Sequence, residues 1–399
     1  MKSFLKSFLY LNILVLSLIL VNLVPNFVIR ENLCESVEYY KNINFTQKFN
    51  VLSKNDPSAD CNELNIMMNV DSSRPVYSSF FVPFYREFDN QDFITMAYKT
   101  IISEEEPNYN YNRYWHGYQI LWRPLMLLFN ASQIMNIMLI GYIILFLFLL
   151  YKLVILNYKN FALGIFLMNI IYIIPFGFNA LEYIPLFYIC VISCLLLLSN
   201  KVDNIVLFCC SGISIAFFDF LTAETLTLTI PLLLYVHINK KNIKFRYCTK
   251  LGLSWMLGYC FTFLYKWFLS TVFLKENFFK IALEKYETHQ SPFDKIFSLK
   301  TNINILFGNV SSVNTTFTIF LVLVTVLLIT LYLFRRDKSE KYIITILLIC
   351  IIPYIRYYVI SDHSFGYAWF TYRAQLVLIP ALILLLAEID FKLVKKRSK

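Results

Sequence analysis

The chain has 399 residues, of which 58% are hydrophobic, 18% aromatic and only 16% charged. Soluble domains carry roughly a quarter charged residues, so this composition excludes an ordinary soluble protein and predicts an all-α, polytopic membrane protein. The net charge of +10 does not indicate nucleic-acid binding, because the basic residues gather in short loops between apolar runs, where they set membrane topology.

Apolar runs near the spanning length of about 20 residues recur along the chain. They predict about ten transmembrane helices, at residues 8–28, 133–151, 161–178, 182–198, 205–219, 222–237, 251–275, 316–334, 342–360 and 374–390. With a cytoplasmic N-terminus, every inside segment carries Lys or Arg, while the short outside turns 179–181 and 220–221 carry none. This repeated positive-inside signal predicts a multi-pass protein of the cell membrane with both termini cytoplasmic.

The runs divide the chain into five parts: an N-terminal transmembrane anchor (1–29), an outside loop with surface helices (30–131), transmembrane helices 2–7 (132–275), a second outside loop (276–315), and transmembrane helices 8–10 with a basic cytoplasmic tail (316–399). The first run is long and no A-x-A site precedes Arg30, so a retained anchor is favoured over a cleaved signal peptide. In the first outside loop, Cys34 and Cys61 are chemically able to form a disulfide, and the sequence leaves their state open.

The first outside loop also holds the candidate catalytic residues. From about Val82 the pattern becomes helical, and Asp89 and Asp92 fall on one face of a helix that is too polar to span a membrane. In a functional interpretation, both carboxylates face other polar residues at the membrane surface. The alternative is that they are solvated or cap the helix N-terminus.

Aromatic residues are dense just downstream, from Tyr114 to Trp122, with His116 and Arg123 among and beside them. Aromatics at this density are typical of the headgroup belt of a membrane protein. The addition of an imidazole and a guanidinium group indicates a contact with a lipid phosphate, so we expect His116 and Arg123 to bind substrate.

Polar side chains also mark the outer ends of the middle spans. Glu182 opens the fourth predicted span, Asp219 and Glu224 flank the turn between the fifth and sixth, and Lys266 lies in the outer half of the seventh. Charged groups in spans are costly and tend to mark sites, although groups at a helix end can reach water and Lys266 can snorkel. We expect Asp219, Glu224 and Lys266 to contact substrate.

The last outside loop combines charge with aromatic residues. Arg356 ends the ninth predicted span, Arg373 opens the tenth, and Asp362 and His363 lie between them. Two arginines near the membrane boundary are suited to holding a phosphate, while neighbouring aromatics stack on a sugar or an isoprene unit. The alternative is an interfacial belt of aromatic and basic residues.

Several expected signatures are missing from the sequence. It has no Gly-rich phosphate loop and no HExxH or GxSxG motif, and its cytoplasmic loops are too short to form a nucleotide-binding domain. Its spans are mostly uninterrupted, unlike the broken helices of secondary transporters. Because the polar residues concentrate outside, a substrate delivered on a lipid is favoured.

The predicted order of segments is one spanning helix, a large outside loop with an acidic motif, and many spans joined by short turns. This order resembles the GT-C architecture of integral membrane glycosyltransferases. The segments NLCES, FDNQD, RYWHGY, FFDFLT and WFTYR also look like those of bacterial polytopic membrane proteins without an assigned function. The GT-C resemblance implies a polyprenyl-phosphate-linked sugar as donor, and a cell-surface glycan, lipid or protein as acceptor. It puts the general base on Asp89 or Asp92, although these follow the first span by about sixty residues and Asp71 competes within that insert.

In the implied mechanism the isoprenoid lies between the helices and the sugar lies in an outside cavity. The phosphate charge is offset by Arg123, Arg356 and Arg373, with Lys266 as a further candidate, while Asp219, Glu224 and His363 position the acceptor. No cofactor is assigned, although clustered carboxylates allow a divalent cation, Mg or Mn. The expected partners are membrane lipids, the lipid-linked sugar and the acceptor, and not nucleic acid. The alternatives are a polysaccharide polymerase or ligase, a non-catalytic flippase or transporter and, more weakly, an acyltransferase.

Overall fold

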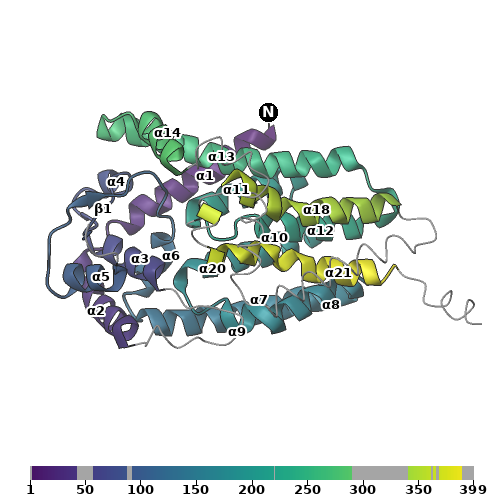
Figure 1. Ribbon diagram of the computed structural model, residues 1–399, viewed down its shortest axis with the longest axis horizontal. Helices are drawn as coiled ribbons and strands as arrows, with labels where there is room; N and C mark the ends of the chain where they lie inside the picture. Colours follow the sequence, from purple (N-terminus) through teal and green to yellow (C-terminus); the bar gives the residue numbers. More distant parts are fainter. Residues whose placement is uncertain are drawn as a thin grey trace, which may run out of the picture.

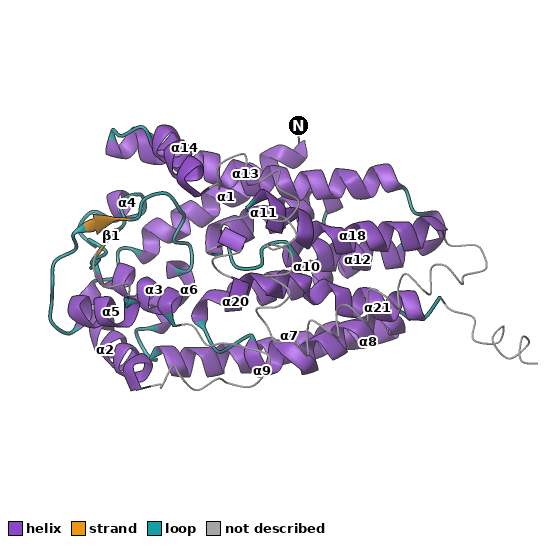
Figure 2. Cartoon of the chain, viewed as in Figure 1, coloured by secondary structure: helices purple, strands orange, loops and turns teal. Residues whose placement is uncertain are grey.

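A computed structural model of the chain describes residues 2–42, 57–87, 92–219, 221–289, 340–360, 363–364 and 368–388. Two regions make up this part of the chain: a bundle of long helices and, at one end of it, a group of short elements between α1 and α7 that we call the cap (Figure 1). The secondary structure is nearly all helical, with one two-stranded sheet in the cap (Figure 2). The fold is therefore all-α, as the composition predicts.

Six segments in the described part of the chain are long and apolar enough to cross a membrane. They are α1 (Lys2–Val21), α7 (Ala131–Ile155), α8 with the following π-helix and α9 (Lys159–Phe176), η2 with α10 (Leu181–Ser199), α13 (Phe245–Leu274) and α18 (Glu340–Val359). Shorter apolar helices are α11 (Asn204–Phe218), α12 (Leu226–Ile238) and η4 (Tyr372–Val377) with α21 (Leu378–Leu386). The predicted count of about ten spans is not confirmed, because these helices fall short of the spanning length and the predicted run at 316–334 lies outside the described residues.

The long helices present apolar side chains on the outer surface of the bundle. On α7, Ile140, Ile144 and Leu147 are exposed, while Tyr142 and Phe146 on the opposite face are buried in the core. A helix satisfies its own backbone hydrogen bonds, so such a surface is stable against hydrocarbon and unstable against water. The fold is that of a membrane protein.

The closest helix packing joins α11 to α13, where two glycines allow the backbones to touch. A Cβ atom added to Gly212 would lie 2.1 Å from the carbonyl oxygen of Trp255, and one added to Gly258 would lie 2.2 Å from that of Cys209. Small residues at such contacts let membrane helices gain dispersion energy over a long interface. The pair fixes α13, which in turn reaches the cap.

The cap contains short helices and the small sheet. Its elements are α2 (Asn26–Asn42), α3 (Ser58–Met68), α4 (Pro75–Ser78), β1 (Pro83–Phe84), α5 (Phe93–Ile101), β2 (Tyr109–Asn110) and α6 (Gln119–Leu125). Leu33 of α2 and Leu64 of α3 belong to the same hydrophobic core as Met135 of α7, so the cap is packed onto the bundle. Cys34 and Cys61 are not joined by a disulfide.

The helices alternate in direction, and this brings the charged ends of several of them to the cap. α3 contacts η2 (Leu181–Tyr183) at the start of α10, and the α11–α12 turn, the end of α18 and the start of η4 lie at the same end of the bundle (Figure 1). The remaining short helices are η3 (Lys240–Asn242), α14 (Phe278–His289) and α20 (Ala368–Thr371).

Candidate functional site

Ionisable side chains from distant parts of the chain gather where the cap meets the helix ends. We call this buried group the charged junction; it comprises Asp60 and Glu63 of α3, Glu182 of η2, Asp219 and Glu224 of the α11–α12 turn, Arg356 of α18 and Arg373 of η4. The charges act on one another electrostatically, Glu63 with Asp60, Glu182 and Asp219, and Glu182 with Arg373. Because a buried charge needs hydrogen bonds or an opposite charge, the partners of each group indicate its role.

Asp60 is the best-satisfied acid of the junction. Its carboxylate accepts hydrogen bonds from the Tyr40 hydroxyl at 2.5 Å and from the backbone N–H groups of Leu181 and Glu182 at 2.9 and 3.1 Å. These donors come from α2 and from the beginning of η2, where a helix leaves its first N–H groups without internal partners. Asp60 therefore ties the cap to the fourth apolar segment, which is a structural role.

Glu63 lies one helical turn further along α3 and is in the opposite situation. It is fully buried, and neither carboxyl oxygen accepts a hydrogen bond from any part of the chain that the structure describes. Burial raises its pKa well above the ordinary value, and the charges of Asp60 and Glu182 raise it further, while the nearby indole of Trp122 lowers it. The site of Glu63 therefore favours the protonated, neutral form of its carboxyl group.

Asp219 ends α11 and sits at the edge of the junction, with 7% of its surface exposed. Its two oxygens accept hydrogen bonds from the N–H of Thr222 at 3.0 Å and the hydroxyl of Thr222 at 2.6 Å, which leaves further lone pairs open. Burial raises its pKa to about 7; the Thr222 contacts and the Arg356 charge lower it and Glu224 raises it. Asp219 therefore exchanges a proton near neutral pH.

Glu224 and Arg356 form a buried ion pair across two segments. The Nε and Nη2 atoms of Arg356 lie 2.9 and 3.3 Å from the two oxygens of Glu224. Burial raises the pKa of Glu224, but the Arg356 charge and hydrogen bonds outweigh this effect and leave it below the ordinary value. This two-point contact is among the stronger polar interactions in proteins.

Arg356 also holds the backbone of the junction. It donates to the carbonyl of Leu221 at 2.7 Å and to the hydroxyl of Ser364 at 2.9 Å, and lies 3.5 Å from Nδ1 of His363. Leu221 has a φ of 64°, a left-handed conformation that is unfavourable for leucine and is typical of constrained functional turns. Arg356 thus fixes the turn that carries Asp219.

Arg373 is surrounded by aromatic rings. Its guanidinium carbon lies 3.8 Å from the ring centroid of Tyr183 and 5.3 Å from that of Tyr372, whose hydroxyl lies 2.5 Å from that of Tyr172. Aromatic faces stabilise a desolvated cation, and the Glu182 charge does so too.

The remaining predicted cationic contacts lie outside the junction. Arg123 donates to the carbonyls of Met67 and Val24, and the ammonium group of Lys266 lies 3.0 Å from the carbonyl oxygen of Ser79. His116 lies between the Tyr118 hydroxyl at 3.2 Å and the carbonyl of Tyr111 at 3.0 Å.

Burial lowers the pKa of His116 to about 3, with a further effect of the Lys266 charge, and burial lowers that of Arg123 to about 10. His116 is therefore neutral and Arg123 charged at pH 7. His116, Arg123 and Lys266 join cap segments to one another or to the bundle. These contacts account for the burial of the three side chains without a bound phosphate.

The predicted catalytic pair is only partly described. Asp89 and Asp362 lie outside the described residues. Asp92 is exposed at the N-terminus of α5, where its carboxylate accepts hydrogen bonds from the N–H of Ile94 at 3.1 Å and the hydroxyl of Thr95 at 2.5 Å. This contact matches the capping alternative, and a catalytic role for Asp92 stays a prediction.

The sequence reasoning missed Asp60 and Glu63. Both residues lie in a part of the sequence that is polar and rich in turn-forming residues, where α3 begins at Ser58. The available signal was the spacing of three between the two acids, continued by Leu64 and Met67 on buried positions, which is the pattern of one helix face. In the described chain no group of three or more His, Cys, Asp or Glu is arranged to hold a metal ion.

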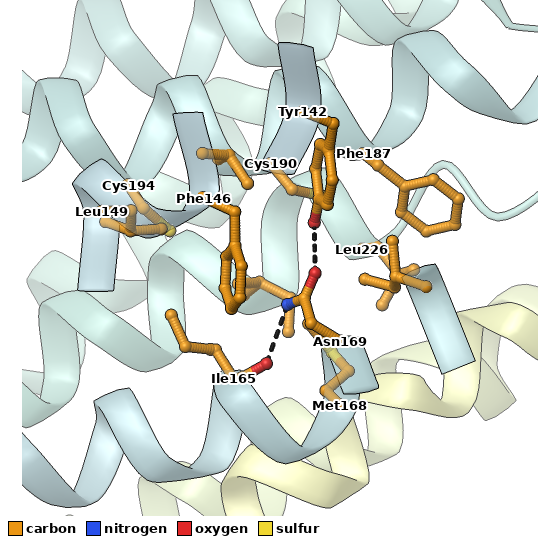
Figure 3. Close-up of a pocket in the computed structure, with 13 residues that line it drawn as sticks. Tyr142, Phe146, Leu149, Ile165, Met168, Asn169, Phe187, Cys190, Cys194 and Leu226 are labelled. Atoms are coloured by element: carbon orange, nitrogen blue, oxygen red, sulfur yellow. Dashed lines mark hydrogen bonds between the residues drawn. The ribbon is translucent and has the colours of Figure 1, made fainter. Parts of the chain in front are cut away.

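Away from the junction, described residues line a cavity in the bundle and another on the cap. The first cavity lies between α7, α8, α10 and α12. It is lined by apolar side chains and by Tyr142 and Asn169, and the Tyr142 hydroxyl donates a hydrogen bond to the Asn169 side-chain oxygen at 2.6 Å (Figure 3). Its volume of about 20 Å³ holds about one water molecule, so it is a packing gap and not a substrate site. The other is a hollow of about 400 Å³ on the cap.

Comparisons with protein families, curated proteins and solved structures give no match.

Proposed function

We propose that this protein is a GT-C-type membrane glycosyltransferase that moves a sugar from a polyprenyl-phosphate donor to a glycan, lipid or protein acceptor. The transfer takes place at the cap end of the bundle, outside the cell membrane, with both termini in the cytoplasm and about ten spans in the whole chain. The observation that carries the proposal is the charged junction, where carboxyl groups able to hold a proton meet guanidinium groups at the end of apolar helices. A proton acceptor and a stabilised phosphate are what this reaction requires.

In this mechanism Asp219 is the general base. The acceptor hydroxyl attacks the anomeric carbon of the donor sugar, its proton passes to the Asp219 carboxylate, and the bond between the sugar and the phosphate oxygen breaks with its electron pair on the phosphate. A base with a pKa near the working pH is the most effective, and Asp219 meets that condition. Arg373 offsets the charge of the departing lipid phosphate, and Arg356 holds the turn in place.

The test is a transfer assay on the full chain in nanodiscs, with decaprenyl-phosphate glucose, mannose, galactose and arabinose as donors and cell-envelope glycan as acceptor. Asp219→Asn is expected to lower turnover by roughly 10²–10⁴-fold, the usual contribution of a general base. Asp92→Asn is the matched control, since the amide also caps a helix. Full activity of Asp219→Asn would show that Asp219 is not the general base. An inactive Asp92→Asn with a normal melting temperature would assign the general base to Asp92 in the cap.

A polymerase or ligase uses a different donor, and the lipids of a deletion strain distinguish it. Accumulation of a lipid-phosphate monosaccharide supports the proposal, whereas accumulation of an oligosaccharide on a lipid diphosphate supports a polymerase or ligase.

A proton-coupled transporter is the second candidate, and Glu63 favours it. Glu63 is a buried protonatable acid at the junction of the cap and the bundle, and it makes no hydrogen bond in the described chain. In liposomes, a transporter moves a lipid-linked sugar in response to a pH gradient and loses this response in Glu63→Gln. Movement without any transferred product would replace the glycosyltransferase proposal.

A further inference from the structure

The hollow on the cap is a concave site that shares no lining residue with the charged junction. It lies between the end of α3, α4 and the β1–β2 sheet, and its lining includes Asp71, Arg74, Tyr77, Phe81 and Asn110. Its volume of about 400 Å³ falls in the range of small-molecule sites. We call it the cap hollow.

The charges of the cap hollow cancel. The carboxylate of Asp71 and the guanidinium group of Arg74 form an ion pair, in which Nε of Arg74 lies 2.7 Å from the Asp71 carboxylate. Hydrogen bonds from Ser73 and Arg74 lower the pKa of Asp71, so the carboxylate stays ionised at neutral pH. An anionic ligand would meet a guanidinium group already held by a carboxylate, so the lining favours a neutral ligand over a phosphate.

The lining also mixes hydrogen-bonding groups with apolar surface. The Asn110 amide and the Tyr77 hydroxyl make no hydrogen bond with any other described residue, and Asn110 is exposed. Phe81 and Pro83 supply apolar surface, and the Phe81 ring is fixed against Tyr77 with centroids 4.9 Å apart. An amide both donates and accepts hydrogen bonds, as does each hydroxyl of a sugar.

We propose that the cap hollow binds a neutral saccharide. A sugar ring presents hydroxyl groups at its edge and C–H groups on its faces, which match the Asn110 and Tyr77 polar groups and the Phe81 and Pro83 surface. A purely apolar chain would leave the polar groups unpaired, and an anion would find no uncompensated cation. The binding itself is independent of catalysis; the assignment of this saccharide as a remote part of the acceptor glycan, whose reacting hydroxyl lies at Asp219, rests on the proposed glycosyl transfer.

The experiment uses the full chain in nanodiscs and an array of neutral oligosaccharides of glucose, mannose, galactose and N-acetylglucosamine beside their sulfated forms. Bound probes are then titrated by calorimetry. We expect neutral probes to bind, and Asn110→Ala and Tyr77→Phe each to weaken binding by roughly 2- to 12-fold, the effect of one hydrogen bond. Asn42→Ala is the matched control, because Asn42 is also an exposed cap asparagine but lies outside the hollow. Binding of sulfated probes alone, no binding, or equal affinity in all variants would overturn the proposal.

The transfer assay distinguishes this proposal from the one it builds on. If transfer occurs, Asn110→Ala is expected to raise the KM for the acceptor and leave kcat unchanged. An unchanged KM would reject only the assignment of the cap hollow to the acceptor, and the glycosyltransferase proposal would stand. If saccharides bind through Asn110 and no transfer is detected with any donor, the hollow stands and the glycosyltransferase proposal fails.

Discussion

The Glu224–Arg356 pair allows a direct measurement of how the charged junction is held together. Both side chains are about 95% buried, with exposures of 4% and 5%. Two unit charges about 4 Å apart at an effective dielectric constant of about 20 attract each other by about 4 kcal/mol. Replacing one partner, in Glu224→Met or Arg356→Met, leaves the other charge buried and unpaired, and we expect either change to reduce the free energy of unfolding by about 3–5 kcal/mol.

The double variant is expected to lose much less than the sum of the two single changes. It buries no unpaired charge, and its main defect is the loss of the Arg356 bonds to the Leu221 carbonyl and the Ser364 hydroxyl, which costs about 1–3 kcal/mol for groups left unsatisfied. A double-mutant cycle from denaturant unfolding in detergent micelles measures the coupling. Single losses below about 1 kcal/mol that add up in the double variant are typical of a solvated pair and would refute the buried junction.

Three further predictions concern stability. The pKa of Asp219 is about 3.8 in the unfolded chain and about 7 in the folded protein, so between these pH values the folded state binds more protons. The free energy of unfolding therefore falls as pH rises, by up to about 1.4 kcal/mol per pH unit. Melting curves of Asp219→Asn should lack this pH dependence, and an unchanged dependence would contradict the prediction. Gly258→Ala should lose about 1–3 kcal/mol because its Cβ meets the Cys209 backbone, whereas Gly252→Ala on the same helix has open space and should gain up to about 1 kcal/mol; equal melting temperatures would reject the close contact. Lys266→Met should loosen the cap, seen as faster proteolysis between α3 and α5, because its bond to the Ser79 carbonyl is lost; wild-type cleavage would show that the bond is dispensable.

Hydropathy predicted the parts of the fold that depend on local composition. A run of apolar residues determines that a helix lies in the membrane, which is why α7, α10, α13 and α18 match predicted spans. It does not show whether a short apolar helix crosses the membrane: α11 and α12 lie at the runs predicted at 205–219 and 222–237, but they have only 15 and 13 residues. The number of spans therefore does not follow from the number of apolar runs.

The site was predictable only where charge stands out against an apolar background. Asp219, Glu224 and Arg356 were recognisable because each interrupts or ends a hydrophobic run, and the structure brings them together. Glu63 lies in a polar stretch, where one more acid carries no signal, and its importance comes from burial under the cap. Conversely, Lys266 bonds a backbone carbonyl of the cap, a role that depends on a contact 187 residues away in sequence.

The balance of charge in the junction links donor binding to the strength of the base. Five acids share the site with two arginines, and Glu63 and Asp219 retain protons at pH values where free carboxyls do not. A donor phosphate adds a further negative charge, which raises the pKa of a neighbouring carboxyl. In the proposed mechanism, kcat/KM should therefore rise through an apparent pKa of about 7 in the free enzyme, while kcat, which reports the donor complex, should rise at higher pH. Coincident profiles for kcat and kcat/KM would show that the phosphate does not approach Asp219, and a wild-type profile in Asp219→Asn would show that another group accepts the proton.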